Sequence, residues 1–95
     1  MGFFDSYFNS GSKYPKTEHQ LSSQKIKELV SHFKVKSLDS TEEGLVEKTL
    51  IARRRGDGKI SLFQIYEALT KLRNQNKISQ VDRDGLMKVF SKSLK

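Results

Sequence analysis

Residues 58–73, GKISLFQIYEALTKLR, decide the fold class of this chain. Their apolar side chains recur at the three- and four-residue spacing of one helical face. Ser61 stands directly before the run and Gln64 follows three residues later, which is the spacing of a capping box. The segment therefore predicts a helix over residues 62–73 that buries one face. The residues of that face are Leu62, Ile65, Tyr66, Leu69 and Leu72.

Three further segments carry similar signals and predict helices over residues 18–36, 41–54 and 80–94. Each starts near a hydroxyl residue that can cap it: Thr17, Ser40 and Ser79 respectively. No segment shows sustained strand alternation. The predicted fold is therefore all-α, a compact four-helix domain over residues 17–95. The apolar faces expected to be buried are Ile26, Leu29, Val30 and Phe33, then Leu45, Val46, Leu50 and Ile51, then Leu86, Met87, Phe90 and Leu94.

Residues 1–16, MGFFDSYFNSGSKYPK, read as an aromatic N-terminal arm without a sustained period. Phe3 with Tyr7, and Phe4 with Phe8, are spaced four residues apart, so one turn of helix would present a single aromatic face. Two interpretations stay open for this face. It either folds back onto the domain to complete a small core, or it docks onto a partner such as another protein.

Composition limits the classes of function. The 95 residues include no cysteine, which excludes disulfides and thiolate sites, and no apolar run reaches the roughly 18 residues of a membrane span. The N-terminus lacks the pattern of a secretory signal, so a cytoplasmic location is expected. A net charge of +7 favours an anionic partner, nucleic acid above all.

The stretch RGDGKISLFQIYEAL, preceded by LVEKTLIARR, resembles an EF-hand over residues 41–73. The resemblance implies a helix–loop–helix with Gly58 at the tight turn and Ile60 packed inward. The positions that would supply calcium ligands fall on Arg53, Arg55, Asp57 and Gln64. Calcium requires several carboxylate or carbonyl oxygens, including a bidentate glutamate, so calcium binding is not expected. The same helix–DG–helix pattern also resembles the TerB-like helical domains of tellurite-resistance proteins, and no functional residue is carried over from either family.

The RRRGDGKIS stretch itself suggests an anion-binding turn. Its two glycines let the backbone approach a phosphate closely, and the start of the following helix offers free N–H groups. The alternative is a solvated helix end, where arginines complement the helix dipole and Asp57 forms a salt bridge. The candidate anion-binding residues are Arg53, Arg54, Arg55 and Lys59, with Lys25, Lys27, Lys34 and Lys36 of the first predicted helix extending the surface.

Catalysis has little support in the sequence. His19 and His32 are the only histidines, and neither belongs to a nucleophile–base or metal-spaced pattern, so no enzyme, metal or cofactor is expected. A DNA-binding helix-turn-helix built from residues 62–73 and 80–94 would need a shorter connection, and Asp82 and Asp84 would flank the phosphates. The predicted function is thus non-catalytic binding of nucleic acid or another polyanion. The competing hypothesis is a protein-interaction adaptor that uses Phe3, Phe4, Tyr7 and Phe8 or a groove between helices.

Overall fold

The computed structural model describes residues 14–31 and 34–94, and its fold is all-α, as predicted. The described chain contains four helices and one small antiparallel sheet of two strands. In the described ranges, no helix is both long enough and apolar enough to cross a membrane. In chain order the elements are β1 (Glu18–Gln20), α2 (Ser23–Val30), α3 (Ser40–Arg53), β2 (Lys59–Ser61), α4 (Leu62–Asn74) and α5 (Gln80–Ser93).

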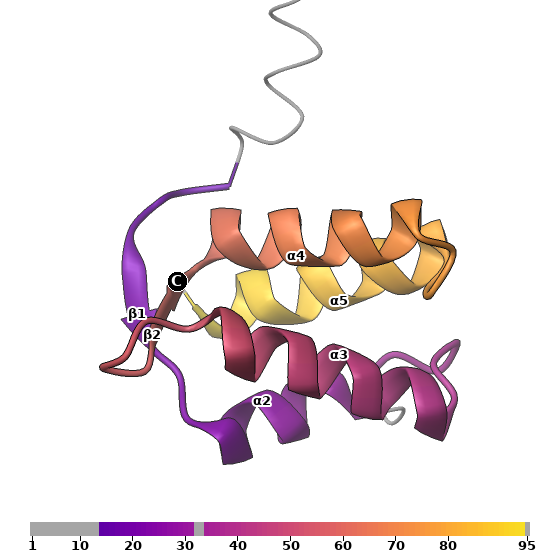
Figure 1. Ribbon diagram of the computed structural model, residues 1–95, viewed down its shortest axis with the longest axis horizontal. Helices are drawn as coiled ribbons and strands as arrows, with labels where there is room; N and C mark the ends of the chain where they lie inside the picture. The colour runs from indigo at the N-terminus through magenta and orange to yellow at the C-terminus, as the bar shows by residue number, and fades with distance from the viewer. Residues whose placement is uncertain (1–13, 32–33, 95) are drawn as a thin grey trace, which may run out of the picture.

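The helices form two layers, with α4 and α5 in one layer and α2 and α3 in the other (Figure 1). Within each layer the two helices pack against each other, and α3 with α4 and α2 with α5 join the layers. The two strands lie together at one end of the bundle, where the chain enters both α2 and α4 (Figure 1). The sheet therefore fixes the starting points of one helix from each layer.

A single apolar core fills the space between the layers. Every helix contributes to it, and so do residues of the connections, which suits a chain short enough to hold only one core. Leu45, Ile51 and Tyr66, which were expected inside, are only partly buried, and Phe33 lies outside the described residues. The largest fully buried apolar side chains are Phe90, Ile26, Leu50, Ile60, Ile65, Leu69, Leu86 and Met87.

The predicted starts of α4 and α5 are confirmed. Ser61 Oγ accepts a hydrogen bond from Gln64 N at 3.1 Å, and Gln64 Oε1 accepts one from Ser61 N at 2.9 Å. Ser79 and Asp82 form the same reciprocal pair at the start of α5. The start of α3 was predicted one residue late, because Asp39 is the cap and Glu42 completes its capping box. Either pair has the required spacing, so spacing alone could not choose between them.

The predicted helix over residues 18–36 is wrong at both ends. Residues Glu18–Gln20 form β1, and the helix begins only at Ser23, capped by Ser22, whose hydroxyl accepts a hydrogen bond from Lys25 N at 3.1 Å. It ends at Val30. The strand arises because residues 18–20 pair with residues some forty positions later, so tertiary pairing overrides the local helical signal.

The strand pairing depends on the backbone at Gly58. In the antiparallel register, Glu18 faces Ser61, His19 faces Ile60 and Gln20 faces Lys59. Leu21 N extends the pairing by donating to Gly58 O at 3.1 Å. Gly58 has φ +85°, a left-handed conformation that side chains with a Cβ rarely adopt.

Asp82 is the one charged residue of the described chain that is buried, with 2% exposure. Its Oδ2 accepts a hydrogen bond from Ser79 N at 2.9 Å, and its Oδ1 accepts one from the hydroxyl of Ser37. Asp82 therefore ties the connection between α2 and α3 to the start of α5. Asp82 is buried, so the expectation that it would flank the phosphates of DNA bound to a helix-turn-helix is wrong.

Replacing Gly58 by alanine is expected to reduce the free energy of unfolding by about 1–3 kcal/mol because of the left-handed backbone. A Cβ there would also lie 2.6 Å from Gln20 Nε2. Gly56→Ala is the matched control, since a Cβ at Gly56 meets no atom within 4 Å. Urea unfolding measures both variants. Equal stability of Gly58→Ala and Gly56→Ala would contradict the assigned turn.

Asp82→Ala is expected to reduce the free energy of unfolding by about 1–3 kcal/mol, because a buried acceptor of two hydrogen bonds is lost. Asp84→Ala removes the same charge two residues away, where the carboxylate is exposed and pairs with Arg83 at 3.2 Å. That control should change stability by less than about 1 kcal/mol. Thermal unfolding followed by circular dichroism compares them, and equal losses would refute the structural role of Asp82.

Candidate functional site

The loop between α3 and β2 is closed by its own hydrogen bonds. Gly58 N donates to Arg55 O at 2.8 Å, and Arg55 N donates to Lys59 O at 2.9 Å. Asp57 Oδ1 accepts from Lys59 N at 3.3 Å, and Asp57 O accepts from Gln20 Nε2 at 2.7 Å. Three backbone N–H groups that could have cradled a phosphate, those of Arg55, Gly58 and Lys59, are thus already used within the loop.

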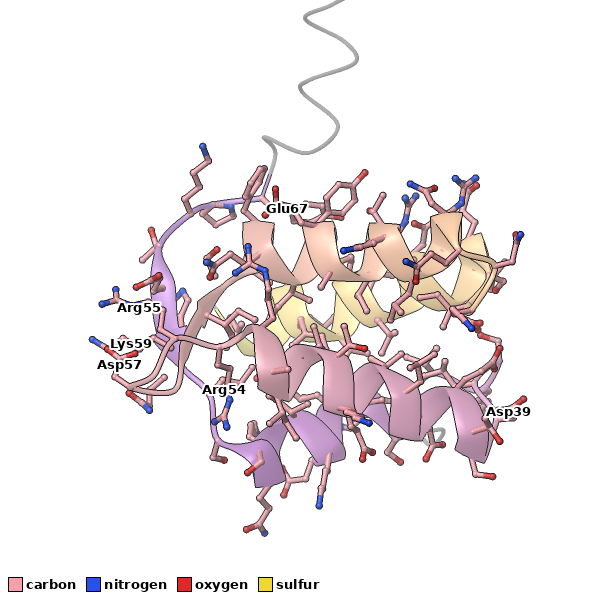
Figure 2. The ribbon with its side chains drawn as sticks, viewed as in Figure 1. Asp39, Arg54, Arg55, Asp57, Lys59 and Glu67 are labelled. Atoms are coloured by element: carbon pink, nitrogen blue, oxygen red, sulfur yellow. The ribbon has the colours of Figure 1, made fainter. Side chains whose placement is uncertain are left out.

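The three consecutive arginines extend toward three different parts of the protein. Arg53 Nη2 lies 3.5 Å from Glu67 Oε1 on α4. Arg54 Nη1 donates to Leu21 O at 2.9 Å, in the connection from β1 to α2. Arg55 Nη1 lies 2.6 Å from Glu18 Oε1 on β1. Figure 2 shows Arg54 pointing toward α2 while Arg55 lies at the outer edge near Asp57 and Lys59.

Arg54 is a structural residue of the loop. It is partly buried, and besides Leu21 O its Nε donates to Ile51 O at 3.3 Å, in the last turn of α3. A guanidinium can donate in several fixed directions at once, so one side chain joins the end of α3 to the entry of α2. Arg54 therefore has a different role from the other candidate anion-binding residues, because its guanidinium is used in these two backbone contacts.

Arg55 already has anionic partners inside the protein. Its pKa is raised above the usual value, chiefly by the side-chain hydrogen bond with Glu18 and then by the charges of Glu18 and Asp57. An external phosphate would have to compete with these carboxylates for the guanidinium. Around the loop, four cations face three carboxylates, which leaves a local charge of only one positive unit. The cations are Arg53, Arg54, Arg55 and Lys59, and the carboxylates are those of Glu18, Asp57 and Glu67.

The start of α4 offers fewer free N–H groups than the anion-binding hypothesis assumed. Ser61 N and Gln64 N belong to the capping box, and Phe63 N donates to Pro15 O at 3.2 Å. The Pro15 contact was not predicted, since residue 15 was placed in the arm. Residues 14–16 lie against α4 in the structure: Tyr14 packs on Tyr66, and Lys16 Nζ lies 4.9 Å from the centre of the Phe63 ring.

The lysines of the first predicted helix are divided between α2 and the connection that follows it. All four are exposed, and Lys25 pairs with Glu28 at 3.6 Å. Lys25 and Lys34 line a shallow groove with Lys92 of α5, over a floor of Leu29 and Val89. The structure thus brings two of these lysines to α5. Arg53 lines a different hollow, together with Lys16, Glu18 and Glu67.

A second hollow lies between α4 and α5 and was missed by sequence reasoning. The rings of Tyr14 and Tyr66 have their centres 5.1 Å apart with a 34° angle between planes. The guanidinium of Arg83 lies 5.3 Å from the centre of the Tyr66 ring. Met87, Lys88 and Lys92 complete this side of the hollow.

The remaining predicted site residues have simple outcomes. Phe3, Phe4, Tyr7 and Phe8 lie outside the described residues, as does His32. His19 is partly buried in β1, so it does not begin a helix as predicted. Among the residues that the structure describes, no three His, Cys, Asp or Glu side chains come together in a way that could hold a metal ion.

Comparison of the chain with models of protein families, with curated proteins and with solved structures finds no match. Functional assignment therefore depends on the geometry of the described residues.

Arg54→Ala is expected to reduce the free energy of unfolding by about 1.5–3 kcal/mol, because two carbonyl groups lose a charged donor. Arg53→Ala should cost less than about 1 kcal/mol, since its pair with Glu67 is exposed. Arg54→Lys keeps the charge but not the two fixed directions, so it should retain only part of the stability. Urea unfolding distinguishes the cases, and an unchanged stability of Arg54→Ala would contradict this assignment.

Proposed function

We propose that this chain is a non-catalytic cytoplasmic binding domain that engages a polyanion, with nucleic acid as the first candidate. One observation carries the proposal. Apart from Lys16, which lies over the Phe63 ring, nine described lysines are exposed and have no described carboxylate within 4.0 Å. Their charges are therefore available to a partner. These are Lys27, Lys34, Lys36, Lys48, Lys59, Lys71, Lys77, Lys88 and Lys92.

Exposed ammonium groups suit the phosphate backbone. Contacts with phosphates release bound counterions from the nucleic acid, which makes the affinity strongly salt-dependent and largely independent of sequence. The arginines of this chain contribute less, because Arg53, Arg54 and Arg55 already contact groups of the protein. In the loop, Lys59 is the side chain best placed to meet a partner, and exposed Arg53 and Arg55 add to it.

Calcium binding is not part of the proposed function. Asp57 Oδ1 already accepts from Lys59 N at 3.3 Å, and Gln64 Oε1 accepts from Ser61 N at 2.9 Å. The two other ligand positions of the EF-hand resemblance are held by the cations Arg53 and Arg55. The EF-hand and TerB-like resemblances remain hypotheses about the α3–loop–α4 unit.

A protein-interaction adaptor is the second candidate, and one groove favours it. Between α3 and α4, the apolar side chains of Leu45, Ala68 and Leu72 form a floor, and Arg53 and Lys71 stand among its polar neighbours. Binding in such a groove would be dominated by apolar contact, so its affinity would change little with salt. Salt dependence therefore separates the two candidates.

The test is fluorescence anisotropy of a labelled mixed-sequence duplex and of one of its strands. Between about 50 and 200 mM salt, affinity should fall with a log–log slope of about 0.9 per phosphate contact for the duplex. A peptide nucleic acid of the same base sequence, which has no phosphates, should not bind. Absence of binding to both charged probes at the lower salt concentration would refute the proposal and favour the adaptor.

The contribution of the loop is tested with the triple variant Arg53→Gln, Arg55→Gln and Lys59→Gln, in which Arg54 is kept because it supports the fold. Weaker duplex binding with a smaller salt slope would place the loop at the interface. Unchanged binding would exclude the loop while leaving the lysine surface as the binding site.

A further inference from the structure

The hollow between α4 and α5 combines aromatic rings with unpaired lysines. Tyr14 and Tyr66 pack together with ring centres 5.1 Å apart, and Met87 adjoins them. Both tyrosine side chains are only partly buried, so part of each ring is accessible from the hollow. Flat rings at the edge of a basic surface are the features on which bases of single-stranded nucleic acids stack.

The charges around the hollow are arranged to leave it positive. Lys88 and Lys92 lie one helical turn apart on α5, both exposed and without a described carboxylate partner. The single acidic residue of the lining, Asp84, is already paired with Arg83 at 3.2 Å. The free charges at the hollow are therefore both positive.

The positive charge continues past the hollow. Lys92 also lines the groove between α2 and α5, together with unpaired Lys34, while Lys25 of the same groove is paired with Glu28. The lysines thus form a path from the α4–α5 hollow across α5 to the end of α2. A phosphate backbone that follows this path would pass beside the tyrosine rings.

We propose that the α4–α5 hollow binds single-stranded nucleic acid. A base stacks against the partly exposed pair of Tyr14 and Tyr66, above the buried side chain of Met87, and the phosphates contact Lys88 and Lys92. A duplex would meet only the lysines, because its bases already stack on one another and cannot reach the rings. An acidic peptide would likewise satisfy the lysines alone. This inference rests on the proposed function and assigns it a surface and a form of nucleic acid.

The experiment compares binding of a labelled oligothymidylate of about 15 nucleotides, within the range that such grooves cover, with a duplex of equal length. Wild-type protein should bind the single strand more tightly. Tyr66→Leu should weaken this binding by about fivefold or more, the effect of losing one stacked base, whereas Tyr66→Phe should keep it. Thermal unfolding of both variants confirms that they are folded at the assay temperature.

The lysines are tested by the double variant Lys88→Gln and Lys92→Gln, both exposed positions. It should lower the log–log salt slope for the single strand by about 1.4, from two contacts at about 0.7 each. Lys16→Gln with Arg73→Gln removes the same charge at two exposed positions that belong neither to the hollow nor to the nine unpaired lysines, and should leave the slope nearly unchanged.

A direct readout comes from the methyl group of Met87. The chain has two methionines, so a sample with labelled methionine methyls gives two signals, and Met87→Leu identifies the one from the hollow. A base stacked in the hollow should shift the Met87 signal by its ring current. A duplex of equal length, which cannot stack a base in the hollow, should leave the Met87 signal nearly unchanged.

The outcomes separate this inference from the proposed function. If nucleic acid binds but Tyr66→Leu and the Lys88/Lys92 variant bind it with the wild-type affinity, the hollow is not the binding site. The proposal of polyanion binding then stands. The hollow is also refuted, with polyanion binding intact, if polyglutamate of equal charge displaces the oligonucleotide as well as unlabelled oligonucleotide does. If neither single strand nor duplex binds at about 50 mM salt, both proposals are refuted.

Discussion

The arrangement of this domain depends on the pairing of residues 18–20 with residues 59–61. One strand leads into α2 and the other into α4, so the pairing sets the relative start of a helix in each layer. Two strands of three residues are too short to be stable alone. They persist here because Ile60 is fully buried and the flanking loop is held by Arg54, Arg55 and Gln20.

This pairing also determines what the basic loop can do. Glu18 is the first residue of β1, and its carboxylate pairs with Arg55. Leu21 directly follows β1, and its carbonyl oxygen accepts a hydrogen bond from Arg54. Closing the sheet therefore brings an acceptor to each of these two arginines. The positive charges of Arg54 and Arg55, which look available in the sequence, therefore stabilise the loop in the structure. The charges of Arg55 and Glu18 largely cancel, so this pair attracts a distant phosphate only weakly.

The sequence predicted the elements whose signals are local. The periodicity and capping residues of residues 61–73 and 79–94 lie within each helix, so α4 and α5 were predicted to within one residue. The strand at residues 18–20 could not be predicted, since its partner lies some forty residues later and three residues carry no period. The same limit applies to Asp82, whose partner Ser37 is 45 residues away.

The candidate site shows the same division between local and distant information. Sequence spacing grouped Arg53, Arg54 and Arg55, but their partners lie on α4, near α2 and on β1. Tyr14 and Tyr66 of the α4–α5 hollow are far apart in the sequence, and only the fold brings them together. The one signal available beforehand was Lys88 with Lys92 at helical spacing.

Arginine and lysine therefore have different roles in this domain. A planar guanidinium with several fixed donors suits permanent contacts with carbonyl and carboxylate groups, and the loop arginines make such contacts. A hydrated ammonium on a flexible stem gains little from a fixed partner, and most described lysines have none. The net charge of +7 counts both kinds equally. Because only unpaired charge remains available to a partner, the proposed binding surface follows from the distribution of lysines and not from the density of basic residues in the sequence.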